Sequence, residues 1–395
     1  MYLFTSENVS PGHPDKCADI ISDTIVDTFL AADPNARVAA EVMIAGKEVV
    51  IGGEVSSTLK PDHDDYEKLV KKALIDIGYT GTGGFSRTQA LHPDDVTVTV
   101  RLNAQSPEIA SGVKREDGEI GAGDQGIMFG YACDETKELM PSAIVFSRRI
   151  RERVYEYALG HPFELGVDIK TQVTVDYGSK EGFDNGEVKR IDTIVVSAPY
   201  TESFGRGNAE RLIRRLIQES GLPEGLVDGR TRLLINPSGS YVGHSALHDC
   251  GLTGRKLIVD TYGGYAPIGG GAQSGKDWTK VDRSGLYAAR WLARRIVEEG
   301  LAKKALVQLS YAIGEAKPVS VTVDTMGTGR SGGGDEELSG RLAGLYPLTP
   351  AWIRDAFGLD RPGEEGFGYA DVAARGQVGV GEWPWERLVA ADGGL

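Results

Sequence analysis

The segment from Gly269 to Ser284 combines flexible backbone with charges of both signs, just ahead of a predicted helix. It reads Gly-Gly-Gly-Ala-Gln-Ser-Gly-Lys-Asp-Trp-Thr-Lys-Val-Asp-Arg-Ser. Glycines let backbone N–H groups approach an anion closely, lysines place point charges against phosphate oxygens, and a carboxylate can hold the Mg²⁺ that polyphosphates carry. The segment therefore predicts a polyphosphate site, although on its own it is also compatible with a solvated glycine-rich surface loop.

This segment is not a P-loop. Gly270 and Gly275 have the P-loop spacing before Lys276, but Asp277 occupies the position of the Ser or Thr whose hydroxyl would bind Mg²⁺. Any phosphate chemistry at Lys276 must therefore use a different arrangement of ligands.

A second anion-binding pattern, Ser10-Pro11-Gly12-His13-Pro14-Asp15-Lys16, lies near the N-terminus. Proline suits the first helical position, so we expect His13 at the N-cap and Asp15 in the first turn. Unpaired N–H groups and the positive end of the helix dipole favour an anion there. The pattern thus brings a histidine donor, a carboxylate for a metal and a lysine to a natural phosphate seat.

Further charges extend or repeat these patterns. Asp19, Asp23 and Asp27 continue from Asp15 at four-residue spacing, and we expect them to be a solvated helix face in preference to a ladder of metal ligands. The turns Leu252–Lys256 and Asp168–Lys170 add cations that, taken singly, are typical of surface charge. The glycine-rich turn Gly121–Gly126 carries Asp124, which we expect to be buried in either a structural turn or a pocket.

Composition excludes several classes of protein. The chain has 395 residues, enough for two or three domains, and its 53 glycines predict many tight turns. A formal net charge of −14 disfavours a nucleic-acid or anionic-membrane binder, so a polyanion must meet a local basic pocket. Three scattered cysteines argue for a reducing compartment, and no apolar run approaches the ~18 residues of a membrane span. With no signal-like N-terminus, we expect a cytoplasmic protein.

The elements that must position these residues follow from periodicity. Alternation of apolar and polar residues predicts strands in the segments Val96–Leu102, Gln172–Val175 and Val319–Asp324. Apolar residues at helical spacing predict helices over Pro14–Leu30, Ala209–Glu219 and Gly285–Glu299. Half-buried sheets covered by helices indicate an α+β fold, and one strand-and-helix set in each third of the chain suggests a threefold repeat.

Several common catalytic motifs are missing from the chain. It has no Gly-x-Ser-x-Gly elbow, no His-Glu-x-x-His and no Gly-x-Gly-x-x-Gly that opens a Rossmann helix. The residues alone therefore indicate an Mg²⁺-dependent enzyme that acts on a nucleotide polyphosphate without a protein nucleophile.

Motifs in a fixed order give the chain a close resemblance to the S-adenosylmethionine synthetases (methionine adenosyltransferases). The matching motifs are Gly12–Lys16, Gly121–Gly126, Gly251–Lys256, Gly269–Ala272, Ser274–Asp277 and Lys280–Ser284. The match runs from Phe4 to Glu386. The resemblance implies synthesis of S-adenosylmethionine by attack of the methionine sulfur on C5′ of ATP, followed by hydrolysis of the tripolyphosphate to pyrophosphate and phosphate. A substrate nucleophile would explain the missing protein nucleophile.

The resemblance also implies an architecture. It predicts three similar domains of mixed or antiparallel sheet covered by helices, about a pseudo-threefold axis. We expect an N-terminal domain over 1–104, a mobile gate loop over 105–118, a central domain over 119–238 and a C-terminal domain over 239–395, with segments interleaved between them. The family works as homodimers or homotetramers with shared active sites, and binds ATP and L-methionine.

Roles for individual residues follow from the matching motifs. Catalysis is implied for His13, Lys170, Arg255, Lys276 and Lys280. ATP contacts are implied for His13, Asp168, Ile169, Lys170, Ser240, Tyr241, Asp249, Arg255, Lys256, Ala272 and Lys276. Methionine contacts are implied for Glu54, Gln105, Asp249 and Lys280. Asp15 and Asp282 are implied as ligands of two Mg²⁺ ions per site, and Glu41 as a ligand of one K⁺ per subunit.

The chain also departs from the common family pattern. Val242–His248 stands where many members have a Gly-Gly-Pro stretch, and Gln273 and Trp278 replace a frequent Phe and Pro. These departures leave two alternatives to the synthetase: a metal-dependent polyphosphate hydrolase without alkyl transfer, and a non-catalytic nucleotide-binding oligomer. The retained charges of the polyphosphate motifs speak against the second. We expect His244 and His248 to be structural.

Overall fold

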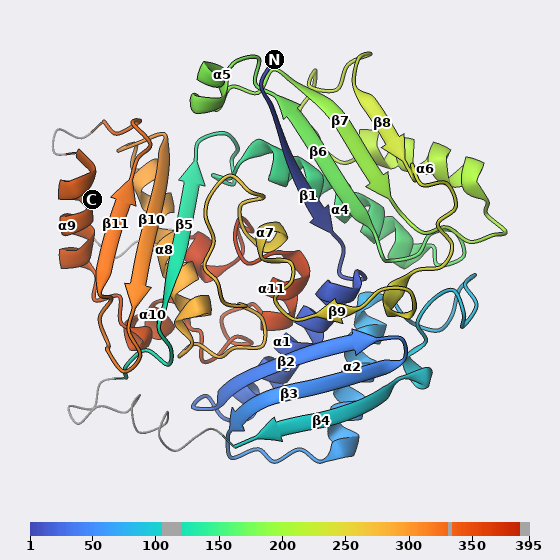
Figure 1. The fold of residues 1–395 in the computed structure, drawn as a ribbon, viewed down its shortest axis with the longest axis horizontal. Helices are drawn as coiled ribbons and strands as arrows, with labels where there is room; N and C mark the ends of the chain where they lie inside the picture. Colours follow the sequence, from blue (N-terminus) through green and yellow to red (C-terminus); the bar gives the residue numbers. More distant parts are fainter. Residues whose placement is uncertain (105–119, 331–333, 388–395) are drawn as a thin grey trace.

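A computed structural model describes residues 1–104, 120–330 and 334–387. The predicted gate loop, 105–118, and Gln105 lie outside the described residues. Three separate sheets, each covered by helices, surround a centre that contains α1, α7 and α11 (Figure 1). The expected α+β fold is confirmed.

The first sheet has the strand order β4-β3-β2-β9. Its strands are Thr97–Asn103, Glu48–Ser56, Arg37–Ala45 and Gly251–Leu252. Helices α1 (Pro14–Ala32) and α2 (His63–Ile77) cover one face, with η1 (Pro93–Asp95) at its side. The short strand β9 pairs antiparallel with β2, so a segment from the middle third of the chain joins a sheet of the first third.

The second sheet, in the order β1-β6-β7-β8, also combines distant segments. Its strands are Leu3–Val9, Lys170–Asp176, Arg190–Ser197 and Arg232–Ile235. Helix α4 (Ser142–Gly160) packs on β1 and β6, and α6 (Arg206–Gln218) packs on α4 and β8. The short helix α5 (Lys180–Asp184) precedes β7. Because β1 is part of this sheet, the residues that follow it, including His13, emerge between the first two sheets.

The third sheet, in the order β11-β10-β5, is antiparallel throughout. Its strands are Ser320–Asp324, Lys304–Tyr311 and Gly126–Cys133, and α8 (Val281–Glu298) packs on β5 and β10. Helices α9 (Gly334–Leu345) and α10 (Pro350–Phe357) pack on β11 and α8. The remaining short elements are α7 (Leu257–Asp260), α11 (Tyr369–Arg375), η2 (Ser245–Leu247) and η3 (Pro384–Glu386).

Local rules explain the start of α1 and miss the start of α8. Pro14 occupies the first turn of α1 and His13 is its N-cap, as predicted. Helix α8 begins at Val281, four residues before the predicted Gly285, so Asp282 lies in its first turn. Val319, predicted to face the core of β11, precedes the strand and is 67% exposed, which corrects that expectation. No helix of the described residues is long and apolar enough to cross a bilayer.

Candidate active site

His13 caps the first helix with its side chain and is buried. Its Nδ1 accepts a hydrogen bond of 3.1 Å from the Asp15 N–H. Burial, followed by the positive charges of Lys256 and Lys170, lowers the pKa of His13 to about 3. The ring is therefore neutral near pH 7, and because Nδ1 is an acceptor, Nε2 carries the proton. His13 can donate a hydrogen bond through Nε2 without adding a charge.

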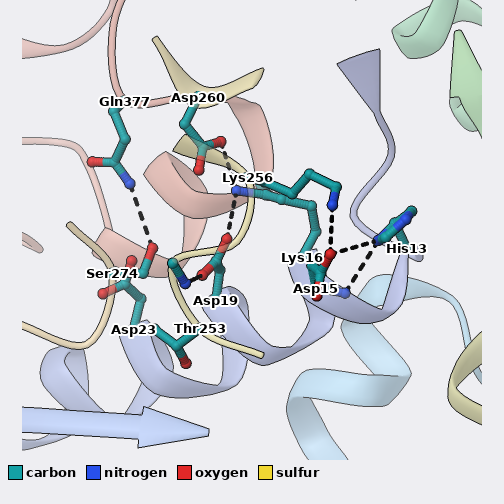
Figure 2. A network of polar contacts seen from close by, with 12 residues as sticks. His13, Asp15, Lys16, Asp19, Asp23, Thr253, Lys256, Asp260, Ser274 and Gln377 are labelled. Atoms are coloured by element: carbon teal, nitrogen blue, oxygen red, sulfur yellow. Dashed lines mark hydrogen bonds and ion pairs between the residues drawn. The ribbon is translucent and has the colours of Figure 1, made fainter. Parts of the chain in front are cut away.

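Beside His13, Asp15 interacts with the Leu252–Lys256 turn, and Figure 2 shows its ion pair with Lys256. Its Oδ1 accepts the Leu252 N–H at 3.0 Å, and its Oδ2 lies 2.5 Å from Lys256 Nζ. Arg255 Nε lies 3.5 Å from Oδ1. Burial alone would raise the pKa of Asp15, but the hydrogen bonds from Lys256 and Leu252 hold it below its usual value. The site thus gathers His13, one carboxylate and two of the predicted ATP contacts.

The Gly269–Ser284 segment lies directly against this turn. A Cβ added to Gly254 would lie 2.5 Å from the Ala272 Cβ, so the two loops touch where glycine is required. Lys276 Nζ pairs with Asp282 Oδ2 at 2.6 Å. The backbone of Gly271 packs so closely on Asp282 that a Cβ there would lie 2.3 Å from the carboxylate carbon. The glycine-rich part of the segment therefore frames Asp282 and Lys276.

Asp168 and Tyr241 form a separate, neighbouring group. Tyr241 Oη donates to the Asp168 carbonyl at 3.1 Å, and the Ser245 N–H donates to Asp168 Oδ2 at 3.1 Å. Asp168 Oδ1 is buried and has no hydrogen-bond partner among the described residues. Burial raises the pKa of Asp168 to about 6. An unpartnered buried carboxylate oxygen is costly, and this oxygen is suited to accept a hydroxyl or amine donor from a ligand.

The other predicted nucleotide contacts differ in exposure. Ile169, which directly precedes β6, is buried, and its N–H donates to Ser10 Oγ at 2.8 Å. Lys170, at the start of β6, and Ser240 and Asp249 are exposed. The Asp249 carboxylate accepts the N–H of the following residue, Cys250. Within residues 1–104, 120–330 and 334–387, neither Lys170 nor Asp249 has an ion pair like those of Lys256 and Lys276.

Of the predicted methionine and K⁺ residues, Glu54 and Glu41 lie on the first sheet, and Lys280 is the N-cap residue of α8. Glu54 on β3 is half-buried opposite Ala39, which itself bridges to Lys276. Glu41 on β2 is exposed. Lys280 Nζ lies 2.5 Å from Asp277 Oδ2 and is largely buried. Asp277 also accepts the Val38 N–H at 2.8 Å, so it fixes this lysine to the edge of β2.

The acidic stripe of α1 contradicts the expected solvated face. Asp19 and Asp23 are buried and Asp27 is partly buried. Asp19 pairs with Lys16, and Asp23 pairs with Arg283 at 2.6 Å. The sequence contained a signal for this result: four like charges at four-residue spacing repel one another on an isolated helix. A stripe with so few cations on its own helix needs partners elsewhere in the chain.

The expectation that Asp124 is buried is also wrong, because this residue is exposed. His244 is buried with its ring edge against Phe85, in keeping with a structural role, whereas His248 is exposed. A cavity of about 260 Å³ opens beside Arg255 and Lys256. Two larger cavities, of about 490 and 520 Å³, are lined by none of the predicted site residues that the structure describes.

Three family models match successive parts of the chain. They are the N-terminal domain of S-adenosylmethionine synthetase over residues 1–107, its central domain over 119–241 and its C-terminal domain over 243–387. Together they cover nearly the whole chain in the order of the predicted motifs.

Individual proteins are similar over the same length. The S-adenosylmethionine synthase of Trichormus variabilis is 45% identical, with 99% of this chain and 96% of the relative covered. The enzyme of the same name from Maricaulis maris is 44% identical, with coverage of 99% and 97%. A solved structure of an unusual S-adenosylmethionine synthetase from Campylobacter jejuni is 61% identical, with a TM-score of 0.94 and coverage of 99% and 98%.

Proposed function

The chain belongs to the S-adenosylmethionine synthetase family and is a methionine adenosyltransferase, and we propose that the cations around His13 and Asp282 bind the triphosphate of its ATP. The observation that carries this assignment is the contact between two cation-bearing loops. One loop carries Arg255 and Lys256, and the other carries Lys276. In each loop the lysine forms an ion pair with one carboxylate. A bound polyphosphate can replace that carboxylate as the partner of the lysine.

The chemistry places few demands on proton transfer. A thioether sulfur needs no deprotonation before it attacks C5′, so the protein must align sulfur with C5′ and stabilise the charge that develops on the departing tripolyphosphate. Lys170, Arg255, Lys256 and Lys276 supply that stabilisation. Neutral His13 adds a hydrogen bond from Nε2, and its lowered pKa supports a role as a donor instead of a general acid.

The two predicted metal ligands suit Mg²⁺. Asp15 and Asp282 are single carboxylates, and Mg²⁺ is commonly held by one or two carboxylates together with substrate phosphates. The described residues contain no cluster of three or more His, Cys, Asp or Glu that could hold a metal unaided, which is consistent with ions that need the substrate. When bound, Mg²⁺ neutralises charge on the phosphate oxygens. We further propose that Glu41 contributes to one K⁺ site per subunit.

The nucleoside and methionine occupy the flanks of this site. Tyr241 offers a ring to adenine, and the unpartnered Asp168 Oδ1 can accept a hydroxyl group of the ribose. Ser240 and the backbone of Ile169 complete the nucleotide contacts. For methionine, carboxylates at Glu54 and Asp249 meet the amine, while Lys280 meets the carboxylate. Gln105 remains a predicted methionine contact. Lys280 would then bridge the substrate and Asp277.

We propose a homodimer, or a homotetramer made of two dimers, with active sites shared between subunits. Each sheet presents an exposed large apolar side chain: Leu3, Met43 and Ile127. The domain boundaries given above, 1–104, 119–238 and 239–395, belong to the same proposal. The free cysteines support a cytoplasmic location.

One assay tests the assignment of the reaction and excludes the alternatives. The pure protein is incubated with ATP, Mg²⁺ and K⁺, with and without methionine, and S-adenosylmethionine, pyrophosphate and phosphate are measured. The expected result is a methionine-dependent sulfonium product with both phosphate products. Phosphate release without that product would instead identify a polyphosphate hydrolase, and tight ATP binding without turnover would identify a nucleotide-binding oligomer.

A further inference from the structure

Two carboxylates of the α1 stripe hold the backbones of the two substrate loops. Asp19 Oδ1 accepts the Gly254 N–H at 2.8 Å, and Asp23 Oδ1 accepts the Gly275 N–H at 2.8 Å. Gly254 directly precedes Arg255 and Lys256, and Gly275 directly precedes Lys276. Each carboxylate therefore fixes the peptide from which a predicted triphosphate-binding cation departs. Figure 2 shows Asp15, Asp19 and Asp23 following one another along the helix toward these loops.

Strand β2 fixes the same loops from the other side. The Thr253 N–H donates to the Val42 carbonyl at 3.0 Å, and the Ala40 N–H donates to the Gly275 carbonyl at 2.8 Å. Each loop is thus hydrogen-bonded to a strand edge and to a helix within two residues of its cation. Because a strand and a helix are rigid elements, the fold determines where the backbone of each cation lies.

The loops cannot hold this position by themselves. Gly254 and Gly275 have φ values of +79° and +82°, a region that side chains disfavour. A Cβ at Gly275 would lie 1.9 Å from the Ala40 carbonyl oxygen, so no side chain fits there to anchor the loop. The carboxylates of α1 supply the anchor that the glycines lack. Their four-residue spacing sets successive anchors about 6 Å apart along the helix.

Burial of these charges argues for a role beyond stability. Asp19 is 1% exposed and Asp23 is fully buried. Asp19 faces Lys16, which also lies 2.7 Å from Asp260 Oδ1, and Asp23 faces the guanidinium of Arg283. Buried ion pairs often contribute no more stability than apolar residues of similar volume would. Two such pairs under the substrate loops are accounted for if they determine where the loops lie.

We propose that Asp19 and Asp23 are positioning residues: Asp19 holds the Arg255–Lys256 loop, and Asp23 holds the Lys276 loop, in the place that triphosphate binding requires. They act through the backbone N–H groups of Gly254 and Gly275 and touch no substrate. This inference rests on the proposed function, which assigns these cations to the triphosphate.

Asp27 provides a matched control on the same helix face. Its two carboxylate oxygens accept the N–H groups of Tyr369 at 2.8 Å and Ala370 at 2.9 Å. These residues begin α11, which contains none of the predicted substrate contacts. Asp27 therefore makes the same kind of backbone contact as Asp19 and Asp23, but to an element outside the site.

The test compares alanine and asparagine variants of Asp19, Asp23 and Asp27. For each, kcat, the KM values for ATP and methionine, and the melting temperature are measured. Displacement of a positioned group by about 1 Å can lower a rate ~100-fold, so we expect Asp19→Ala and Asp23→Ala to lower kcat between about 10-fold and 100-fold. The KM for methionine should stay within about twofold, because only the triphosphate loops move. Asp27→Ala should lower the melting temperature and leave kcat within about threefold.

Asparagine keeps the volume and one oxygen that can accept the glycine N–H. Asp19→Asn and Asp23→Asn should therefore recover part of the lost kcat, and they cover the case in which an alanine variant fails to fold. A kcat close to that of the parent enzyme in folded Asp19 and Asp23 variants, with only the melting temperature lowered as for Asp27→Ala, would overturn the inference. Equal loss of kcat in all three positions would also overturn it.

Lys276→Ala separates failure of this inference from failure of the proposed function. If Lys276→Ala loses kcat while the Asp19 and Asp23 variants keep it, the cation assignment stands and the positioning role fails alone. If Lys276→Ala keeps the parent kcat, the triphosphate assignment fails and the inference falls with it.

Discussion

Two buried ion-pair networks, one at the start of α1 and one between α8 and η3, differ in how completely their members are satisfied. In the second, Glu386 is fully buried and receives two hydrogen bonds of 2.9 Å from Arg290 and one of 2.8 Å from Arg294. The remaining N–H groups of Arg290 donate to backbone carbonyls, and the Gly379 N–H donates to Glu386. Glu386 and Arg290 are thus fully partnered and buried, which fits a structural role, and the Nε of Arg294 is the one buried donor of these three residues without a partner among the described residues.

The network at α1 is open toward solvent. The side chains of Lys256 and Lys276 are each 17% exposed, and that of Arg255 is 50% exposed. In the part of the chain that the structure describes, each of the two lysines donates to one carboxylate only, although an ammonium group carries three N–H donors. Both networks bury charge, but the binding site differs from the structural network because its partly exposed cations have N–H donors left for a ligand.

The largest expected effect tests the structural network around Glu386. Glu386→Gln removes the only carboxylate that the described structure places on both Arg290 and Arg294. Breaking a buried ion pair costs about 3–5 kcal/mol of unfolding free energy, which chemical denaturation should detect. The control, Glu382→Gln, alters an exposed pair with Arg375 and should change stability by less than about 0.5 kcal/mol. Equal effects of the two variants would refute the distinction between the structural and the open network.

The next effect tests the open network. Lys276→Ala removes a donor to the triphosphate, and loss of one such donor costs about 3 kcal/mol of transition-state stabilisation, or roughly 100-fold in kcat. Its melting temperature should change little, because Asp282 is partly exposed. The matched control is Lys180→Ala, at an exposed pair with Asp184, which should keep the parent kcat. A larger rise in the KM for methionine than fall in kcat would mean that Lys276 binds the other substrate.

The start of α1 could be predicted from sequence because its causes are local. Proline at the first helical position and a capping residue before it depend on adjacent residues only, and both were found where expected. The motif resemblance added the contacts of Asp15 and Lys256, although these residues are separated by 241 positions. A resemblance can assign residues distant in sequence to one site, and the roles that it implies for Asp15 and Lys256 stay predictions.

The burial of Asp19 and Asp23 could not be predicted from periodicity. Their partners, Gly254 and Gly275, lie 235 and 252 residues further along the chain. The repulsion along the stripe indicates that partners are needed, but a helical wheel does not show which distant loops of the fold supply them. The same limit applies to β1, β5 and β9, each of which joins a sheet whose other strands are distant in sequence.

The smallest effect concerns pH and contrasts Asp27 with Glu386. Burial raises the pKa of Asp27 from 3.8 to about 7. Glu386 is also buried, but the guanidinium groups of Arg290 and Arg294 hold its pKa below the usual value. The native protein therefore retains a proton on Asp27 between about pH 4 and pH 7 that the unfolded chain has released. Folding takes up a proton in this window, so this group lowers stability as the pH rises.

Asp27→Asn removes that proton linkage. Between pH 6 and pH 8 the free energy of unfolding of the variant should improve relative to the parent by about 1 kcal/mol, as measured by urea denaturation at each pH. Asp33→Asn, at the C-cap of the same helix, is the control: the pKa of Asp33 is lowered by the Thr58 N–H, so this group stays ionised throughout the range and the difference should be constant. If the difference in unfolding free energy between Asp27→Asn and the parent does not change between pH 6 and pH 8, Asp27 is already ionised at pH 6. In that case two backbone N–H groups stabilise a buried carboxylate as well as the two guanidinium groups around Glu386 do.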